Sequence, residues 1–347
     1  MSHMSEKMGR IRPAWRRFWR SAGLFFVAAS LCIACNAQPE NEAANNLPTL
    51  VVGNSPWPGF VAQFVAEEKG FYAEEGIAID EKFLQVSTDV NTALAGDRVD
   101  IAWTGVPDMV VMANDDPSLR LVAVSDYSDG ADGILAKNVA APEDLVGKTI
   151  AWEELPLQAL LLEAYLDGTD VVLTDLDLKV MPAAEAATAF AAGQVEVAIT
   201  FEPWLTTAVK EGDGDVVFTS ANTNLIAGGL VGKAEVIESR REDLNAYFRA
   251  LEKGFAFYQE NTKEAIEIVA NKLNLAAEEL PPILETVRLF RPSEHQSVVF
   301  NTADSLNIMD SINFAAQVGK EMEIVDPEVA PDTLFDASFT EDISAEG

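Results

Sequence analysis

The sequence predicts an α/β protein made of two lobes, each built on a parallel sheet. Short apolar runs alternate with amphipathic segments through most of the chain, which is the pattern of parallel strands joined by helices. The chain has 347 residues, more than one hydrophobic core usually supports. Turn-rich stretches at residues 129–133 and 225–232 mark two points where the chain crosses between the lobes.

The first strand and helix are the clearest local signal. Residues 50–52 are β-prone, and Phe60 and Phe64 recur at helical spacing, so a loop at residues 54–59 separates a strand from a helix. Ligands of open α/β sheets bind outside the carboxyl ends of the strands, where helix N-termini offer unpaired N–H groups. This loop is therefore expected to face a ligand, with Trp57 as a flat contact surface.

The other elements follow in order along the chain. In the first lobe, strands are expected at 79–84, 99–103 and 119–125, and helices at 87–95 and 108–113. In the second lobe, strands are expected at 149–152, 178–181 and 195–201, and helices at 157–166 and 183–192. After the return crossing, helices at 241–257 and 263–273 and a segment at 281–339 should pack back on the first lobe.

The N-terminal region reads as a secretory signal. Five arginines within residues 10–20 precede an apolar run at 22–34, which is shorter than the roughly 20 residues of a membrane span. Cys35 is the expected lipid-attachment residue. Cleavage near Ala37 is the open alternative, because Cys32 stands where an aliphatic residue is usual.

These signals divide the chain into six segments. The predicted divisions are a signal peptide (1–34), a lipid-anchored tether (35–47), the first part of lobe one (48–130), lobe two (131–231), the C-terminal part of lobe one (232–339) and a tail (340–347).

The charge balance is strongly acidic. The formal net charge is −32, and residues 1–34 carry six of the 24 basic and one of the 56 acidic side chains, so the remainder has a net charge of −37. Nucleic acid is therefore not expected as a partner. Such an excess of acidic residues is typical of proteins that stay soluble in a salty medium. Any bound anion would have to be held by local dipoles against the electrostatic field of the net negative charge.

Cysteine and histidine are nearly missing. Without residues 1–34, Cys35 is the only cysteine and His295 the only histidine. Zinc clusters, thiol nucleophiles and disulfide pairs are thereby excluded, although a carboxylate pair would still permit acid/base work. We expect no catalytic residue, metal or cofactor, and a protein that is not an enzyme.

Four tryptophans lie at or just after the ends of predicted strands. Trp57 and Trp103 belong to the first lobe, and Trp152 and Trp204 to the second, so their rings are placed to sandwich a flat or cationic ligand. Such contacts contribute roughly 0.5–2 kcal/mol each. The alternative is that Trp103 and Trp152 are core residues.

Carboxylates accompany these rings. Asp132, Glu153 and Glu202 are expected to accept hydrogen bonds from amino or ammonium groups, whereas a buried carboxylate facing nitrate or sulfonate would repel it. The alternatives are a turn role for Asp132, a helix cap for Glu153 and a solvent-facing Glu202. The other predicted ligand-binding residues are Asn54, Ser55, Phe60, Thr104, Asp108 and Gln158.

Several stretches together resemble a known family. They are VVGNSPWPGFVAQFVAEEKGFYAEEG (51–76), TALAGDRVDIAWTG (92–105), DYSDGADGILAK (126–137), EDLVGKTIAW (143–152) and AFAAGQVEVAITFEPW (189–204). The chain from about residue 47 to 339 resembles the SsuA/THI5-like, or NMT1-like, substrate-binding proteins of ABC importers. That family includes binders of nitrate, bicarbonate, taurine, alkanesulfonates and pyrimidine precursors of thiamine, and a few enzymes.

The resemblance implies a type II periplasmic-binding-protein fold with a two-strand hinge. It also implies a monomer in the periplasm or cell envelope, held to the membrane by its lipid, that captures a small molecule and delivers it to a permease and its ATPase. The favoured solute is a small nitrogen-containing or heteroaromatic compound. A nitrate, sulfonate or taurine receptor, a sensor, and an enzyme of thiamine-pyrimidine metabolism remain the alternatives.

Overall fold

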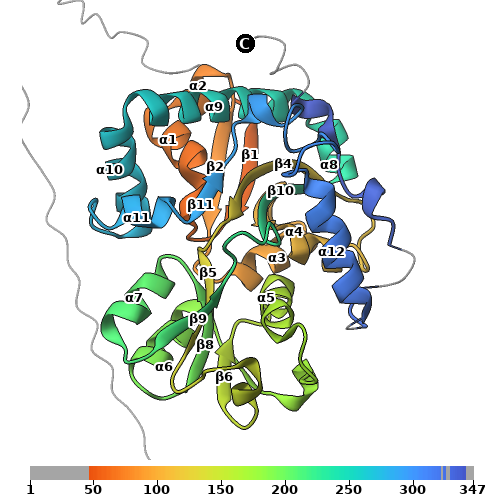
Figure 1. Cartoon of the computed structure of the whole chain (residues 1–347). Coiled ribbons are helices and arrows are strands. Elements are labelled where there is room, and N and C mark those ends of the chain that lie inside the picture. Colours follow the sequence, from red (N-terminus) through yellow and green to blue (C-terminus); the bar gives the residue numbers. More distant parts are fainter. Residues whose placement is uncertain (1–46, 322, 326–328, 341–347) are drawn as a thin grey trace, which may run out of the picture. The chain divides into compact units, whose positions relative to one another are not determined.

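Two sheets organise the part of the chain described by this computed structural model, residues 47–321, 323–325 and 329–340 (Figure 1). The predicted signal peptide, Cys35 and most of the predicted tether lie outside these residues. The six-stranded sheet has the order β11-β4-β10-β3-β1-β2, and the five-stranded sheet has the order β7-β6-β8-β5-β9. We call the elements around the first sheet the first lobe and those around the second sheet the second lobe.

The strands of the first lobe are β1 (Thr49–Asn54), β2 (Ala78–Phe83), β3 (Ile101–Gly105), β4 (Leu119–Ser128), β10 (Ala227–Lys233) and β11 (Val287–Leu289). Those of the second lobe are β5 (Asp132–Ala136), β6 (Thr149–Trp152), β7 (Asp177–Val180), β8 (Val197–Phe201) and β9 (Asp215–Thr219). Central strands β5 and β8 are buried along their whole length, while edge strands β2 and β7 keep exposed residues. Continuous apolar runs are typical of strands covered on both faces.

The helices of the first lobe are α1 (Val61–Lys69), α2 (Phe71–Glu74), α3 (Ser87–Ala95), α4 (Val106–Met112), α8 (Ala234–Ser239), α9 (Arg241–Glu260), α10 (Thr262–Leu273), α11 (Leu280–Leu284) and α12 (Ile308–Glu321). Those of the second lobe are α5 (Pro156–Leu166), α6 (Ala183–Ala191) and α7 (Trp204–Glu211). Short 3-10 turns occur at η2 (Pro58–Phe60), η3 (Pro142–Leu145), η4 (Leu173–Asp175), η5 (Pro292–Glu294), η6 (Pro331–Thr333) and η7 (Ala337–Thr340).

The longest helix, α9, shows why the C-terminal part of the chain returns to the first lobe. Its buried residues include Leu244, Phe248, Leu251 and Phe255, which recur at helical spacing and form an apolar stripe. The stripe packs on α1, and the approach is so close that a Cβ atom at Gly254 would overlap the carbonyl oxygen of the facing helix. A larger residue at this position would push the two helices apart.

The two-lobed α/β prediction is confirmed, but the sheets are mixed rather than parallel. β1 runs parallel to β2 and β3, and β6 runs parallel to β7 and β8. β5 and β10 are the strands by which the chain enters each sheet from the other lobe, and both run antiparallel to their neighbours. A strand that comes from the opposite lobe enters the sheet at the edge where the neighbouring strands β3 and β8 end. It therefore runs antiparallel to them.

The two crossings are joined by serine hydroxyl groups. Ser128, at the end of β4, lies 2.7 Å from Ser220 between their Oγ atoms, and Ser220 follows β9. The amides of Gly130 and Asp132 donate to Ser220 Oγ, and Asp132 N–H also donates to Ser128 Oγ. The crossings therefore share hydrogen bonds immediately beside the first residue of β5.

The return crossing comes earlier than the predicted division at residue 231. Residues of β10 pair with β3 and β4, so they belong to the first sheet, and the chain changes lobe between β9 and β10. The sequence prediction also omitted α7, α8, β9, β11 and α12. Within the described residues, no helix is long and apolar enough to cross a membrane.

Candidate functional site

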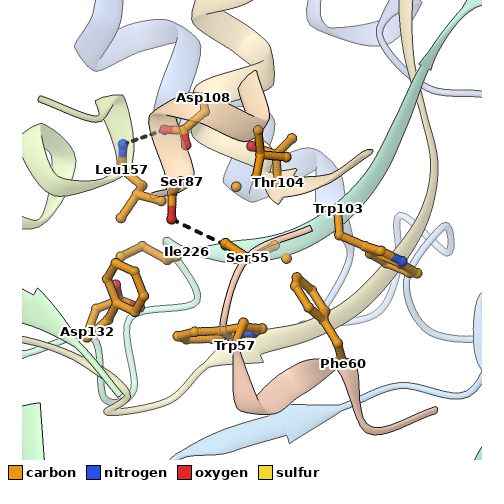
Figure 2. A pocket seen from close by; sticks show the side chains of 15 residues that line it. Ser55, Trp57, Phe60, Ser87, Trp103, Thr104, Asp108, Asp132, Leu157 and Ile226 are labelled. Carbon is orange, nitrogen blue, oxygen red and sulfur yellow. Dashed lines mark hydrogen bonds between the residues drawn. The ribbon is translucent and has the colours of Figure 1, made fainter. Parts of the chain in front are cut away.

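A cavity of about 60 Å³ lies where carboxyl ends of strands from both lobes meet the crossings (Figure 2). The ends of β1, β3 and β8 contribute, together with the starts of α3, α5, β5 and β10. It is lined by Ser55, Trp57, Phe60, Ser87, Val90, Trp103, Thr104, Gly105, Asp108, Asp132, Leu157, Phe201, Ile226, Ala227 and Gly228.

Aromatic rings form one wall of the cavity. The ring centroids of Trp57 and Phe201 lie 5.9 Å apart at an interplanar angle of 67°, which is an edge-to-face contact between the lobes. Phe60 and Trp103 lie 5.4 Å apart in a tilted arrangement. In Figure 2, Trp57, Phe60 and Trp103 lie along the same side of the cavity. A planar solute would find ring faces and edges here, not aliphatic side chains.

The loop after β1 fixes the position of Trp57. Its indole Nε1 donates to Asp126 Oδ2 at 3.0 Å, and Ser125 Oγ donates to the same oxygen at 2.5 Å. Gly59 lies between the partners, and a Cβ atom there would overlap both the carboxylate and the indole nitrogen. Glycine at this position is what lets the indole reach the carboxylate.

Asp132, the first residue of β5, is one of the residues that line the cavity. It is 2% exposed, and its Oδ2 has no hydrogen-bond partner among the described residues. Burial raises the pKa of Asp132 from 3.8 to about 7; Asp126, Asp108 and Glu202 add to the rise, and a hydrogen bond from Ser128 opposes it. An acceptor that is buried without a partner is costly, and a donor on a bound solute would relieve that cost.

Asp108 is the second carboxylate of the lining. Its Oδ1 accepts the backbone N–H of Leu157 at 3.0 Å (Figure 2). Its Oδ2 accepts from Asn91 Nδ2 at 3.3 Å. Burial raises the pKa of Asp108 to about 7, against the two hydrogen bonds, and Glu153 adds to the rise. Because Leu157 belongs to α5, this carboxylate of the first lobe reaches the second lobe.

Asp126 lies behind the aromatic wall and does not line the cavity. Burial raises its pKa to about 6, while the hydrogen bonds from Ser125 and Trp57 lower it. Its Oδ1 is buried and has no partner in the described part of the chain. Neither lysine nor arginine is among the residues that line the cavity. The site therefore concentrates carboxylate oxygens and aromatic rings without a basic side chain.

Seven of the predicted site residues line the cavity: Ser55, Trp57, Phe60, Trp103, Thr104, Asp108 and Asp132. Trp103 also occupies a core position, which was the alternative prediction for this residue. It is 4% exposed, and its Nε1 donates to Tyr247 Oη at 2.9 Å.

The other predicted residues do not line it. Asn54 donates to Glu81, Glu202 accepts from the backbone and hydroxyl of Thr206, and Gln158 accepts from the amide of Glu153. Trp204 packs on Phe201 with centroids 4.9 Å apart, and Trp152 is a core residue of the second lobe. Glu202 is buried instead of facing solvent, because it caps the first turn of α7. Phe201 takes the cavity position that was predicted for Trp204.

Glu153 has a structural position instead. Its Oε1 accepts the N–H of Thr88 at 2.9 Å, and its Oε2 accepts the N–H of Ala183 at 3.1 Å. The predicted alternative of a helix cap is correct in kind, but the capped helices are α3 and α6, not the helix that follows in sequence.

The sequence-based list omitted Ser87, Val90, Gly105, Leu157, Phe201, Ile226, Ala227 and Gly228. Phe201 ends a predicted strand, so its place was available from the same rule that selected Trp57. Ile226, Ala227 and Gly228 line the cavity because the chain leaves the return crossing and enters β10 there, which an apolar run alone does not indicate. Among the described residues, no group of three or more His, Cys, Asp and Glu side chains is arranged to hold a metal ion.

Comparison with known proteins agrees with this fold. The family model described as NMT1/THI5 like matches residues 57–265, which is more than half of the chain. The chain belongs to the NMT1/THI5-like family. This match spans most of the cavity-lining residues of both lobes.

Curated relatives of the chain are binding proteins. A binding protein of Brucella abortus (strain 2308) is 23% identical over 255 residues, covering 72% of this chain and 78% of the relative. The formylaminopyrimidine-binding protein of Halalkalibacterium halodurans is 24% identical over 252 residues, covering 67% of this chain and 72% of the relative.

Solved structures share the fold. The periplasmic aliphatic sulphonate binding protein SsuA of Escherichia coli superposes with a TM-score of 0.67 at 16% identity, covering 82% of this chain and 91% of SsuA. The desulfurization enzyme DszB superposes with a TM-score of 0.62 at 15% identity, covering 86% of this chain and 99% of the enzyme. The fold therefore occurs in both receptors and an enzyme, so the function has to be inferred from the residues of the site and not from the fold.

Proposed function

We propose that this protein is the solute-binding component of an ABC-type importer, and that its solute is a small amine, amidine or amino-substituted heteroaromatic compound. The observation that carries the proposal is the buried Oδ2 of Asp132, which has no hydrogen-bond partner among the described residues and belongs to a residue that lines a cavity without lysine or arginine. A group of this kind binds N–H donors and repels anions. The formylaminopyrimidine-binding relative fits the same chemistry.

The aromatic wall supports a planar or cationic solute. Stacking or cation-π contact with Trp57 contributes roughly 0.5–2 kcal/mol, and a hydrogen bond to a charged carboxylate contributes about 1.5–3 kcal/mol. A micromolar dissociation constant corresponds to about 8 kcal/mol of binding free energy. The aromatic contact, the hydrogen bond to the carboxylate and the burial of the solute together supply this amount, after subtraction of the entropy lost when solute and side chains become ordered. A cavity of about 60 Å³ requires the lobes to separate before a ring-sized solute enters.

The mechanism we propose is hinged closure. The solute binds first to the lobe that carries Trp57 and then gains contacts from Asp132 and Phe201 on the other side. Closure needs such differential affinity, because a ligand shifts a conformational equilibrium only by binding one state better. The closed form then docks on a membrane permease driven by its ATPase, as a monomer in the periplasm or cell envelope.

A panel of solutes tests this function directly. Thermal unfolding and isothermal titration with aminopyrimidines, primary amines, amidines and quaternary ammonium compounds should give at least one solute of micromolar affinity. Asp132→Asn should weaken that binding tenfold or more, because the charged acceptor is lost. If no compound with N–H donors or positive charge binds, and sulfonate or nitrate does, the proposed solute class is wrong.

Membrane attachment through Cys35 is part of the proposal and has its own test. The full-length chain expressed in a bacterial host should incorporate radiolabelled palmitate, and Cys35→Ser should abolish the label while the protein is still exported. Labelling that persists in Cys35→Ser would contradict attachment at this residue. An enzyme on this fold is the alternative; unchanged solute after prolonged incubation with the purified protein argues for a receptor.

A further inference from the structure

Three helix N-termini meet near the cavity, and the protein's own carboxylates occupy all three. Glu153 accepts the second-residue N–H of α3 from Thr88 and the first-residue N–H of α6 from Ala183. Asp108 accepts the second-residue N–H of α5 from Leu157. These are the donors that would otherwise bind an anion, because the first turn of a helix has unpaired N–H groups and a partial positive charge.

The arrangement is reciprocal between the lobes. Glu153 follows β6 of the second lobe and reaches α3 of the first lobe, and Asp108 lies on α4 of the first lobe and reaches α5 of the second. Each lobe thus supplies one carboxylate to a helix of the other. Both side chains are almost fully buried, at 3% and 1% exposure. Water therefore screens these contacts little, and each is worth more than a surface pair.

An anionic solute entering this site would meet N–H groups that are already bonded and buried carboxyl groups. The two carboxylates accept one first-turn N–H of each of α3, α5 and α6, and Asp132 is a second carboxylate beside Asp108 in the lining. No basic side chain lines the cavity to compensate. The first-turn N–H groups of Thr88, Leu157 and Ala183 that these carboxylates accept are therefore not free to bind an anion.

We propose that Glu153 and Asp108 determine the solute class. Their carboxylates accept N–H groups at the N-termini of α3, α5 and α6 beside the cavity. These contacts join the lobes and exclude anions from the helix N-termini. This inference deepens the proposed function and rests on it, since it names the residues that make the receptor reject sulfonate-like or sulfate-like solutes. Removing Glu153 should uncover the N-termini of α3 and α6 and convert the cleft into an anion site.

The test is a gain of anion binding. Sodium sulfate and sodium methanesulfonate are titrated into the wild type and Glu153→Ala, with sodium chloride at matched ionic strength as reference. We expect sulfate or methanesulfonate to bind Glu153→Ala at least tenfold more tightly than the wild type. The matched control is Glu154→Ala, because Glu154 is the next residue, carries the same charge and is exposed. This control should bind these anions no better than the wild type.

A misfolded variant cannot imitate this result, because anion binding has to be gained. If Glu153→Ala does not fold, Glu153→Gln decides by the same titration, since glutamine removes the charge but keeps an acceptor oxygen and nearly the same volume. Folded Glu153→Ala or Glu153→Gln protein that binds sulfate no better than Glu154→Ala overturns the inference. Failure of the wild type to bind amines would overturn the proposed function alone, because the anion titration is independent of it.

Discussion

Phe201 and Trp57 belong to different sheets, yet their rings meet edge to face with centroids 5.9 Å apart. The contact lies on the cavity wall, so both rings are placed to touch the same solute. Phe201→Leu keeps an apolar side chain but removes the ring. We expect solute affinity to fall about fivefold to tenfold, in line with aromatic pair energies of roughly 1 kcal/mol, measured by isothermal titration.

Phe218→Leu is the control for this prediction. Phe218 lies on β9 and packs against Tyr165 away from the cavity. Its replacement should lower stability without changing affinity. Equal losses of affinity in the two variants would mean that the ring of Phe201 has no direct part in binding.

Solute binding should depend on pH through Asp132. Burial raises the pKa of Asp132 to about 7, so the carboxylate gains its charge near neutrality. For a solute that stays cationic up to pH 9, affinity should rise between pH 5.5 and 8.5, by as much as tenfold per pH unit below about 7. Asp132→Asn should flatten this profile as well as lower the affinity. A wild-type affinity that does not change over this range would contradict the role of the carboxylate.

The same carboxylate should make stability fall as pH rises. The folded state of Asp132 holds its proton up to about pH 7, whereas the unfolded chain loses it near the ordinary value of 3.8. Between these values the folded state binds more protons, so its stability is full below pH 4 and declines toward pH 7. At pH 8, the free energy of unfolding of Asp132→Asn should exceed that of the wild type by on the order of 1–3 kcal/mol in urea denaturation. At pH 4 the two proteins should differ little. A difference that is larger at pH 4 than at pH 8 would reverse the sign and refute the assignment.

Gly59→Ala should act through the hydrogen bond between Trp57 and Asp126. The added methyl group would overlap both partners, so the indole has to leave the carboxylate. We expect a loss of about 1–3 kcal/mol of unfolding free energy, as for a buried acceptor that loses a partner. The double variant with Trp57→Phe should lose much less than the sum of the single losses. Additive losses in urea denaturation would show that Gly59 matters for another reason.

Glu202→Gln should leave solute binding nearly unchanged. The sequence alone pointed to Glu202 as an acceptor for the solute, but both its oxygens accept from Thr206 within the first turn of α7. Affinity for the best amine is therefore expected to change less than twofold, while Asp132→Asn weakens it tenfold or more. A loss in Glu202→Gln as large as that in Asp132→Asn would show that Glu202 turns toward the solute.

Much of the fold follows from local pattern. The runs that became β1, β3, β6 and β8 are buried apolar segments with a helix after each, and their alternation predicts the two sheets. The direction of β5 and β10 was not predictable in the same way. An apolar run has the same sequence pattern in either direction, and only the passage between lobes sets which end of the strand enters the sheet first.

The site was predictable where position along a strand determines it. Trp57, Thr104 and Asp108 follow strand ends, and the strand-end rule places them at the cavity. Glu153 also follows a strand end, yet its carboxylate turns to Thr88 and Ala183. The sequence could not show this, because the helix N-termini that capture it come from residues far along the chain in both directions.

The hydroxyl groups of Ser128 and Ser220 bond to each other and to the amide of Asp132, where the chain passes between the sheets. Two independent connectors would allow the lobes to rock and to shear separately. Connectors that share hydrogen bonds restrain each other, and Asp132, a residue that lines the cavity, lies directly beside these bonds. We therefore expect a solute bound beside Asp132 to act where the two connectors meet, so that a small local adjustment there is coupled to the relative motion of the lobes.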